Sequence, residues 1–244
     1  EISGNQCLIV TPLKEDESVD EESSRRMIDF VIENGVHGIL VHGSTGEGFL
    51  FDTDERKAYA DLVVRQVRGR VPVGFCVESS STAVSVELSK YGKKAGVDYL
   101  FTTAPYRHPH KGNGIYEHFK AINDATDLPV SIYDGGAGIE LGLDLLEKIS
   151  NELQRIRYCK IFLEKPEKIA QIMDRCKGRI IPWAGNDRLT YLMLCYGAYG
   201  MTSAASCIVP RENSDMFTLV KEGKLDEARK IYLSKIVPLN AMAF

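Results

Sequence analysis

Short apolar runs alternate with longer amphipathic segments along the whole chain. Eight of the runs are rich in β-branched and aromatic residues and have the length of buried strands. The predicted strands cover residues 7–10, 37–43, 71–77, 98–103, 128–134, 157–162, 180–185 and 199–205. The segments between them have the spacing of apolar positions that is typical of amphipathic helices.

The predicted helices carry start and stop signals. Ser18 and Glu21 have the spacing of a capping box, and Asp52 and Glu55 repeat that spacing after the second strand. Gly35 follows the last apolar position of the first helix, where a glycine commonly ends a helix. The sequence therefore predicts a regular alternation of one strand with one helix.

This alternation determines the expected fold class, which is α/β. Strands joined by single helices run parallel, because each crossover returns the chain to the same end of the sheet. Eight such units close most economically into a TIM (β/α)8 barrel, and an open doubly wound sheet is the alternative. No linker rich in Pro, Gly or Ser divides the chain, so we expect one barrel domain in residues 1–222.

Composition narrows the possible partners. The net charge of −4 and the pI near 5.8 argue against a nucleic-acid-binding surface. The sequence contains neither an apolar run of a membrane span nor a signal sequence at its start, so we expect a cytoplasmic protein. Because no C-x-x-C pair occurs, reduced and mostly buried thiols are expected. The six cysteines are at positions 7, 76, 159, 176, 195 and 207.

Lys160 interrupts the apolar run of the sixth predicted strand. Such a lysine either extends its ammonium group to solvent or has its charge suppressed by burial. A lysine with a pKa of ~10.4 is neutral in only about one molecule in 10³–10⁴ at pH 7. Burial against an apolar wall lowers that pKa and makes the amine a nucleophile, which can form a Schiff base with a ketone.

Other polar residues follow predicted strands, at the end of a barrel where active sites form. The segment HGSTGEG (42–48) offers the hydroxyls of Ser44 and Thr45 and several backbone N–H groups to a carboxylate, although a tight turn would need the same glycines. Tyr133 closes the fifth strand, where it is either a core residue or a proton shuttle. With Lys160, these residues converge on the chemistry of a 2-oxo acid.

Two further patterns are weak signals for a metal site and for a dinucleotide-binding loop. His108 and His110 resemble a metal-binding pair, but Pro109 between them and the lack of a nearby carboxylate favour a solvated loop. The glycines of segment 135–142 match a dinucleotide-binding loop loosely and follow the fifth strand rather than the first. We therefore expect neither a metal nor a cofactor.

Several long segments resemble the dihydrodipicolinate synthase / N-acetylneuraminate lyase superfamily of class I, Schiff-base lyases. They include HGSTGEGFLFDTDERK (42–57), CKIFLEKPEKIAQI (159–172) and AGNDRLTYLMLCYGAYGMTSAASCIVPR (184–211). The resemblance implies a TIM barrel, a pyruvate-like 2-oxo acid substrate, no metal or dissociable cofactor, and a homo-oligomer, either a dimer or a tetramer. It also implies that residues 223–244 are the start of a truncated C-terminal helical extension.

The resemblance also implies roles for single residues. Lys160 is expected to form the Schiff base, and Tyr133 to relay protons with the help of the Ser44 hydroxyl. Thr45 is expected to bind the substrate carboxylate. Thr202 occupies the position whose backbone carbonyl faces the lysine amine.

Three departures from the family pattern leave the substrate open. Arg107 follows Tyr106 where the synthases place a second relay tyrosine, so both residues are candidates for substrate binding. The loop 135–142 is shorter than its counterpart and lacks the arginine that recognises an aldehyde's carboxylate, and Ile161 replaces an acidic residue after the lysine. The alternatives to a synthase are a lyase of the N-acetylneuraminate type, a 2-keto-3-deoxy sugar acid aldolase or dehydratase, and a catalytically impaired 2-oxo acid-binding protein.

Overall fold

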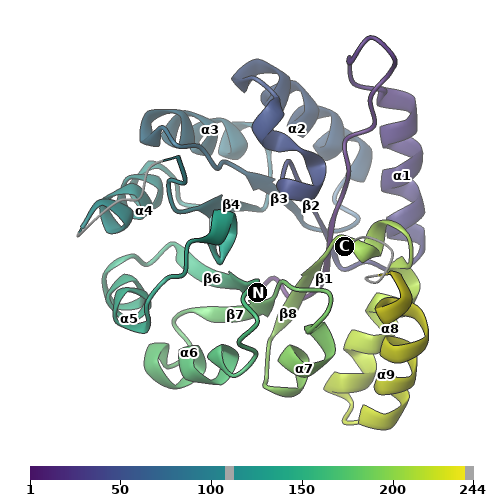
Figure 1. The fold of residues 1–244 in the computed structure, drawn as a ribbon. Coiled ribbons are helices and arrows are strands. Elements are labelled where there is room, and N and C mark those ends of the chain that lie inside the picture. Colours follow the sequence, from purple (N-terminus) through teal and green to yellow (C-terminus); the bar gives the residue numbers. More distant parts are fainter. Residues whose placement is uncertain (108–112, 240–244) are drawn as a thin grey trace.

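A closed barrel of eight parallel strands forms the centre of the protein, and helices surround it (Figure 1). The computed structural model describes residues 1–107 and 113–239 of the 244-residue chain. Neighbours in the sequence are neighbours in the sheet, and β1 pairs with β8 to close the ring. The strands are β1 (Gly4–Leu8), β2 (Gly38–Val41), β3 (Val73–Cys76), β4 (Tyr99–Thr103), β5 (Val130–Asp134), β6 (Ile156–Ile161), β7 (Ile181–Ala184) and β8 (Gly200–Ser203). The predicted TIM barrel is confirmed.

Helices follow the strands as expected. They are α1 (Glu21–Glu33), α2 (Thr53–Val67), α3 (Thr82–Ala95), α4 (Gly114–Ala125), α5 (Leu143–Glu152), α6 (Lys168–Cys176), α7 (Thr190–Cys195), α8 (Pro210–Lys221) and α9 (Leu225–Ile231). A short π-helical segment, η5 (Tyr232–Ile236), continues α9. Ala228 of α9 and Ile236 of η5 are buried, so this C-terminal helical segment packs against the barrel's outer layer. Within the described ranges, no helix is long and apolar enough to span a bilayer.

The ends of some elements differ from the prediction. The Asp52 box is confirmed, because the Asp52 side chain accepts from the Glu55 N–H at 2.9 Å and Glu55 Oε2 accepts from the Asp52 N–H at 2.8 Å. The Ser18 box is wrong: Asp20 caps α1 instead. Ser18 is held in the preceding turn, where its hydroxyl donates to Asp16 at 2.6 Å. The first strand begins at Gly4 rather than at residue 7, and its polar residues Asn5 and Gln6 are fully buried.

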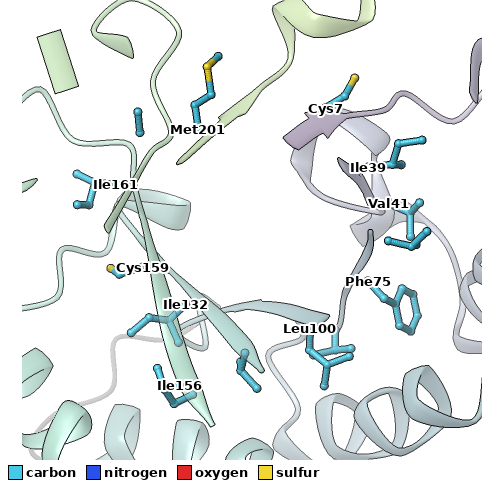
Figure 2. Packing of buried hydrophobic residues seen from close by; sticks show 14 of the residues in the cluster. Cys7, Ile39, Val41, Phe75, Leu100, Ile132, Ile156, Cys159, Ile161 and Met201 are labelled. Atoms are coloured by element: carbon cyan, nitrogen blue, oxygen red, sulfur yellow. The ribbon is translucent and has the colours of Figure 1, made fainter. Parts of the chain in front are cut away.

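Side chains alternate between the two sides of each strand, as the pleat of a β-strand requires. On β6, Cys159 and Ile161 belong to the apolar layer between strands and helices, part of which Figure 2 shows. Tyr158 and Lys160 point into the barrel instead. The apolar residues of the barrel interior are Leu8, Leu40, Cys76, Tyr99, Phe101, Tyr133, Tyr158 and Trp183.

Aromatic rings fill the barrel on the N-terminal side of Lys160. Trp183 is fully buried and stacks on Tyr158, with 4.5 Å between ring centroids. Tyr99 meets Trp183 edge-on at 5.7 Å. Such rings bury large apolar areas. They form an aromatic floor inside the barrel.

The six cysteines are free thiols. Those at 7, 76, 159 and 176 are buried, as expected from their apolar surroundings. Cys195 is exposed and Cys207 is partly exposed. Cys195 is the last residue of α7, whose buried residues are Thr190, Met193 and Leu194.

Candidate active site

A cavity of about 720 Å³ opens at the C-terminal end of the barrel. It brings together four residues that the sequence singled out, namely Lys160, Tyr133, Ser44 and Thr45. Its other lining residues are Leu8, Gly135, Ala137, Gly138, Phe162, Glu164, Gly185, Asn186, Asp187, Arg188 and Ala204. They come from the ends of several strands, which is the usual composition of a site in this fold.

Lys160 is the central residue of this cavity. Only 5% of it is exposed, and burial lowers the pKa of its ammonium group to about 8, although the negative charges of Asp187 and Glu78 oppose the shift. Gly185, the residue after β7, leaves the space for the lysine, since a Cβ there would lie 2.5 Å from Lys160 Cγ. At pH 7 the neutral amine is therefore populated far more than in a solvated lysine.

Tyr133 lies directly opposite Lys160 in the register of β5 and β6. Lys160 Nζ is 4.2 Å from the centroid of the Tyr133 ring and 5.7 Å from that of Phe101. Phe162 meets the Tyr133 ring edge-on at 6.1 Å. Burial raises the pKa of the Tyr133 phenol, so the group is protonated at neutral pH and can donate a hydrogen bond into the cavity.

The Ser44–Thr45 turn forms another part of the lining. Residues Ser44–Gly46 adopt one turn of 3₁₀ helix directly after β2. Thr11 Oγ1 donates to the Gly46 carbonyl at 2.7 Å, and a Cβ on Gly46 would lie 2.8 Å from the Ile9 carbonyl oxygen. The glycine therefore permits the close packing that a tight turn needs, and Ser44 and Thr45 line the cavity.

Three charged lining residues were not singled out by the sequence: Glu164, Asp187 and Arg188. Asp187 is held in place by the N–H groups of Ala204 and Ala205, which donate to its Oδ2 at 3.1 Å each. Burial raises the pKa of Asp187. Its position just after the seventh strand was an available signal, because that is where barrel loops carry function.

Glu78 and His42 lie in the buried surroundings of the site. Burial raises the pKa of Glu78, while Arg56, which donates to the Glu78 carbonyl at 3.0 Å, opposes that shift. Burial and the Arg56 charge lower the pKa of His42 to about 3. His42 is therefore neutral, and it packs edge-on against Tyr59 at 5.0 Å as a core residue.

The loop after β5 is anchored by a buried ion pair. Lys168 Nζ of α6 lies 2.6 Å from Asp134 Oδ2, and both side chains are at most 3% exposed. Asp134 Oδ1 accepts from the Leu141 N–H at 2.7 Å, and Lys168 donates to the Leu141 carbonyl at 2.7 Å. These bonds hold both ends of the loop whose Gly135 and Gly138 line the cavity.

The remaining candidates are not among the residues that line the cavity. Thr202 is fully buried on β8, where it pairs with Gln6 of β1. Tyr106 is 38% exposed, and the exposed Arg107 donates its backbone N–H to Ser80 Oγ at 3.3 Å. The proposed histidine pair at 108 and 110 lies outside the described residues. Within the described part of the chain, no three His, Cys, Asp or Glu side chains are grouped as metal ligands would be.

Fold and site together define a TIM barrel with a buried, weakly basic lysine in an open cavity. The model of the dihydrodipicolinate synthetase family matches residues 1–244. The 4-hydroxy-tetrahydrodipicolinate synthase of Pelobacter propionicus is 36% identical over 241 residues, which are 98% of this chain and 82% of that protein. The chain belongs to the dihydrodipicolinate synthetase family, and the resemblance noted from its motifs is confirmed.

Solved structures agree with this assignment. The dihydrodipicolinate synthase from Aquifex aeolicus is 30% identical and has a TM-score of 0.91, with 95% of this chain and 79% of that chain covered. The chloride-inhibited synthase from Acinetobacter baumannii, solved in complex with pyruvate, has a TM-score of 0.91 at 26% identity and covers 95% of this chain and 80% of that chain.

Proposed function

We propose that this protein is a class I lyase or synthase that forms a Schiff base between Lys160 and pyruvate. The observation that carries the proposal is a lysine that is 5% exposed, has a pKa lowered to about 8, and faces an open cavity. Family membership supports the same chemistry. The synthase names of the relatives favour condensation with an aldehyde over the sugar acid and binding-protein alternatives.

The cavity residues have distinct roles in this proposal. The neutral Lys160 amine attacks the C2 ketone of pyruvate, and the resulting carbinolamine loses water to give an iminium ion. The iminium draws electrons from C3, so that a C3 proton is lost and an enamine forms. The enamine carbon then adds to the carbonyl carbon of an aldehyde. Tyr133, assisted by Ser44, donates the proton that leaves with the carbinolamine oxygen, and Thr45 binds the pyruvate carboxylate.

Reductive trapping tests the proposal. The protein is incubated with pyruvate and a borohydride, and the modified residue is located by peptide mass spectrometry. We expect one covalent adduct on Lys160 and none in Lys160→Ala. An adduct on another lysine, or equal labelling of the Lys160→Ala variant, would exclude the proposal.

Lys168 provides an internal control for this experiment. It is as buried as Lys160, but its amine is engaged by Asp134 at 2.6 Å and by Glu140 at 3.2 Å. If burial alone caused the reactivity, both lysines would be labelled. If the reaction requires a neutral amine that is accessible from the cavity, only Lys160 will be labelled.

The second substrate requires a separate test. Aldehydes that carry a carboxylate are offered together with pyruvate, and pyruvate consumption is followed. Release of pyruvate from 2-keto-3-deoxy sugar acids or from N-acetylneuraminate is measured in parallel. Thermal stabilisation by pyruvate without turnover of any of these compounds would instead identify a binding protein.

We further propose that the chain assembles into a homo-oligomer, either a dimer or a tetramer, as its family resemblance implies. Sedimentation velocity over a range of protein concentrations tests this. We expect a single species with the mass of two or four chains, and a monomer at all concentrations would contradict the proposal.

A further inference from the structure

Two cysteines meet where the barrel closes. Cys7 of β1 and Cys207, the last residue of η4 (Ala205–Cys207), are 200 positions apart in the sequence, yet their Sγ atoms are 3.8 Å apart. Cys7 pairs in register with Ser203 of β8, and η4 follows that strand directly. Figure 2 shows Cys7 on the outer side of its strand, near Ile39.

At this separation the two sulfur atoms are in contact. A disulfide has an S–S length of about 2.05 Å, so the sulfurs must approach by roughly 1.8 Å to form one. Cys7 is held in β1 by the pairing of that strand with β2 and β8, and Cys207 lies in the 3₁₀ turn that follows β8.

The two thiols differ in their access to solvent. Cys7 is completely buried, whereas Cys207 is partly exposed, so only Cys207 can meet a dissolved oxidant. The hydrogen bond with Cys7 lowers the pKa of Cys207, while burial raises the pKa of Cys7. In the reduced protein Cys207 Sγ also contacts the Leu8 carbonyl at 3.1 Å. Exposure and acidity therefore both make Cys207 the thiol that is oxidised first and Cys7 the thiol that then reacts with it.

We propose that Cys7 and Cys207 form a reversible oxidation site for peroxides. The Cys207 thiolate attacks one oxygen of hydrogen peroxide, the O–O bond breaks, and a sulfenic acid and a hydroxide ion result. The Cys7 sulfur then attacks the Cys207 sulfur; the S–OH bond breaks, and the hydroxyl leaves with the Cys7 proton as water. In total, two thiols are oxidised to a disulfide and one peroxide is reduced to two water molecules. A dithiol reductant reverses the change.

The site borders the proposed active site without being part of it. Leu8, whose carbonyl contacts Cys207, lines the cavity. Ala204 and Ala205, whose N–H groups hold Asp187, immediately precede Ser206 and Cys207. A disulfide would link this turn covalently to β1. The inference goes beyond the Schiff-base function and stands even if that function is wrong.

Peptide mapping after oxidation tests the proposal. The folded protein is treated with hydrogen peroxide in small molar excess, remaining thiols are alkylated, and the digest is analysed without reduction. We expect the peptides of Cys7 and Cys207 to be linked as the main product, with the loss of two hydrogen atoms, and to separate after treatment with dithiothreitol. If all six cysteines are recovered in alkylated form, or if linked peptides containing Cys195 predominate, the proposal is overturned.

Two variants sharpen the experiment. Cys195→Ser removes an exposed thiol and should leave the Cys7–Cys207 link unchanged. Cys7→Ser removes the responding thiol, so a sulfenic acid should accumulate on Cys207 and be captured by dimedone. A Cys7→Ser protein in which Cys207 takes up no dimedone would contradict the order of attack. The linked peptides in the unsubstituted protein decide the proposal even if this variant does not fold.

Discussion

Lys160 and Tyr133 occupy opposite positions on adjacent strands, and the lysine Nζ lies 4.2 Å from the centroid of the tyrosine ring. The ring is therefore part of the wall that excludes water from the amine, and its hydroxyl is available to the cavity. The contribution of the ring to the wall and that of the hydroxyl to proton transfer can be separated experimentally, because the hydroxyl can be removed while the ring is kept.

Replacement of Tyr133 by phenylalanine keeps the wall and removes the proton donor. We expect kcat with pyruvate to fall by about 10²–10⁴-fold, the usual contribution of a positioned acid–base group. Labelling of Lys160 should persist at a reduced rate, and the thermal unfolding temperature should change little. Steady-state kinetics and circular dichroism measure both effects; unchanged kcat would remove Tyr133 from the relay.

The pH dependence of trapping reports the Lys160 pKa. The neutral amine is the nucleophile, and burial lowers its pKa from 10.5 to about 8. Below about pH 8 the initial rate of cyanoborohydride trapping with pyruvate should rise about tenfold per pH unit, and above this pH it should level off. A rate that climbs steadily to pH 10 would indicate a solvated lysine instead.

The buried Lys160 should lower the free energy of unfolding at neutral pH. Its pKa is lower in the folded than in the unfolded protein, so between pH 8 and 10.5 the unfolded chain binds more protons and stability rises with pH. Below that window the full cost, about 3 kcal/mol, is present. Urea denaturation at pH 7 should find Lys160→Met more stable than the unsubstituted protein by an amount of this order. The advantage should shrink by about 1.4 kcal/mol per pH unit above pH 8.

Substitution of Gly185 tests whether the reactivity of Lys160 depends on the position of its side chain. A Cβ at this position would lie 2.5 Å from Lys160 Cγ and 2.6 Å from Lys160 Cε, so Gly185→Ala must displace the side chain. We expect trapping to fall by more than about tenfold and stability by roughly 1–3 kcal/mol. Gly142→Ala is the matched control, since a Cβ there meets no atom within 4 Å. Equal behaviour of the two variants would contradict this argument.

The Asp134–Lys168 ion pair should stabilise the loop after β5. Loss of one partner leaves a buried charge uncompensated, which typically costs 3–5 kcal/mol, and we expect Lys168→Met to lose about that much. The double variant Asp134→Asn/Lys168→Met should recover part of the loss. Lys93→Met breaks a solvent-exposed pair with Asp127 and should cost no more than about 1 kcal/mol in the same urea titration.

The fold could be predicted from the sequence because its signals are local. Each strand is a short apolar run, each helix an amphipathic one, and their alternation leaves few topologies. The first helix shows the limit of such signals: Ser18 and Asp20 are both good caps, and only the turn around Asp16 decides in favour of Asp20.

Lys160 could be singled out because a charged residue is conspicuous in an apolar strand, whereas Asp187 and Arg188 are ordinary in a polar loop. Their place in the cavity depends on how the loops after β6, β7 and β8 pack together. A local sequence pattern does not predict that packing. The Cys7–Cys207 contact is unpredictable for the same reason, because the sequence separates the two residues by most of the chain.

The aromatic floor inside the barrel bears on how the substrate choice of such a protein can evolve. Trp183 and Tyr158 stack on one another inside the ring of strands, whereas Glu164, Asp187 and Arg188 line the cavity from the loops that follow the strands. Asp187 belongs to both parts, because its negative charge raises the pKa of Lys160. We therefore expect exchanges at Glu164 or Arg188 to change which aldehyde is accepted, whereas an exchange at Asp187 would also change the nucleophile.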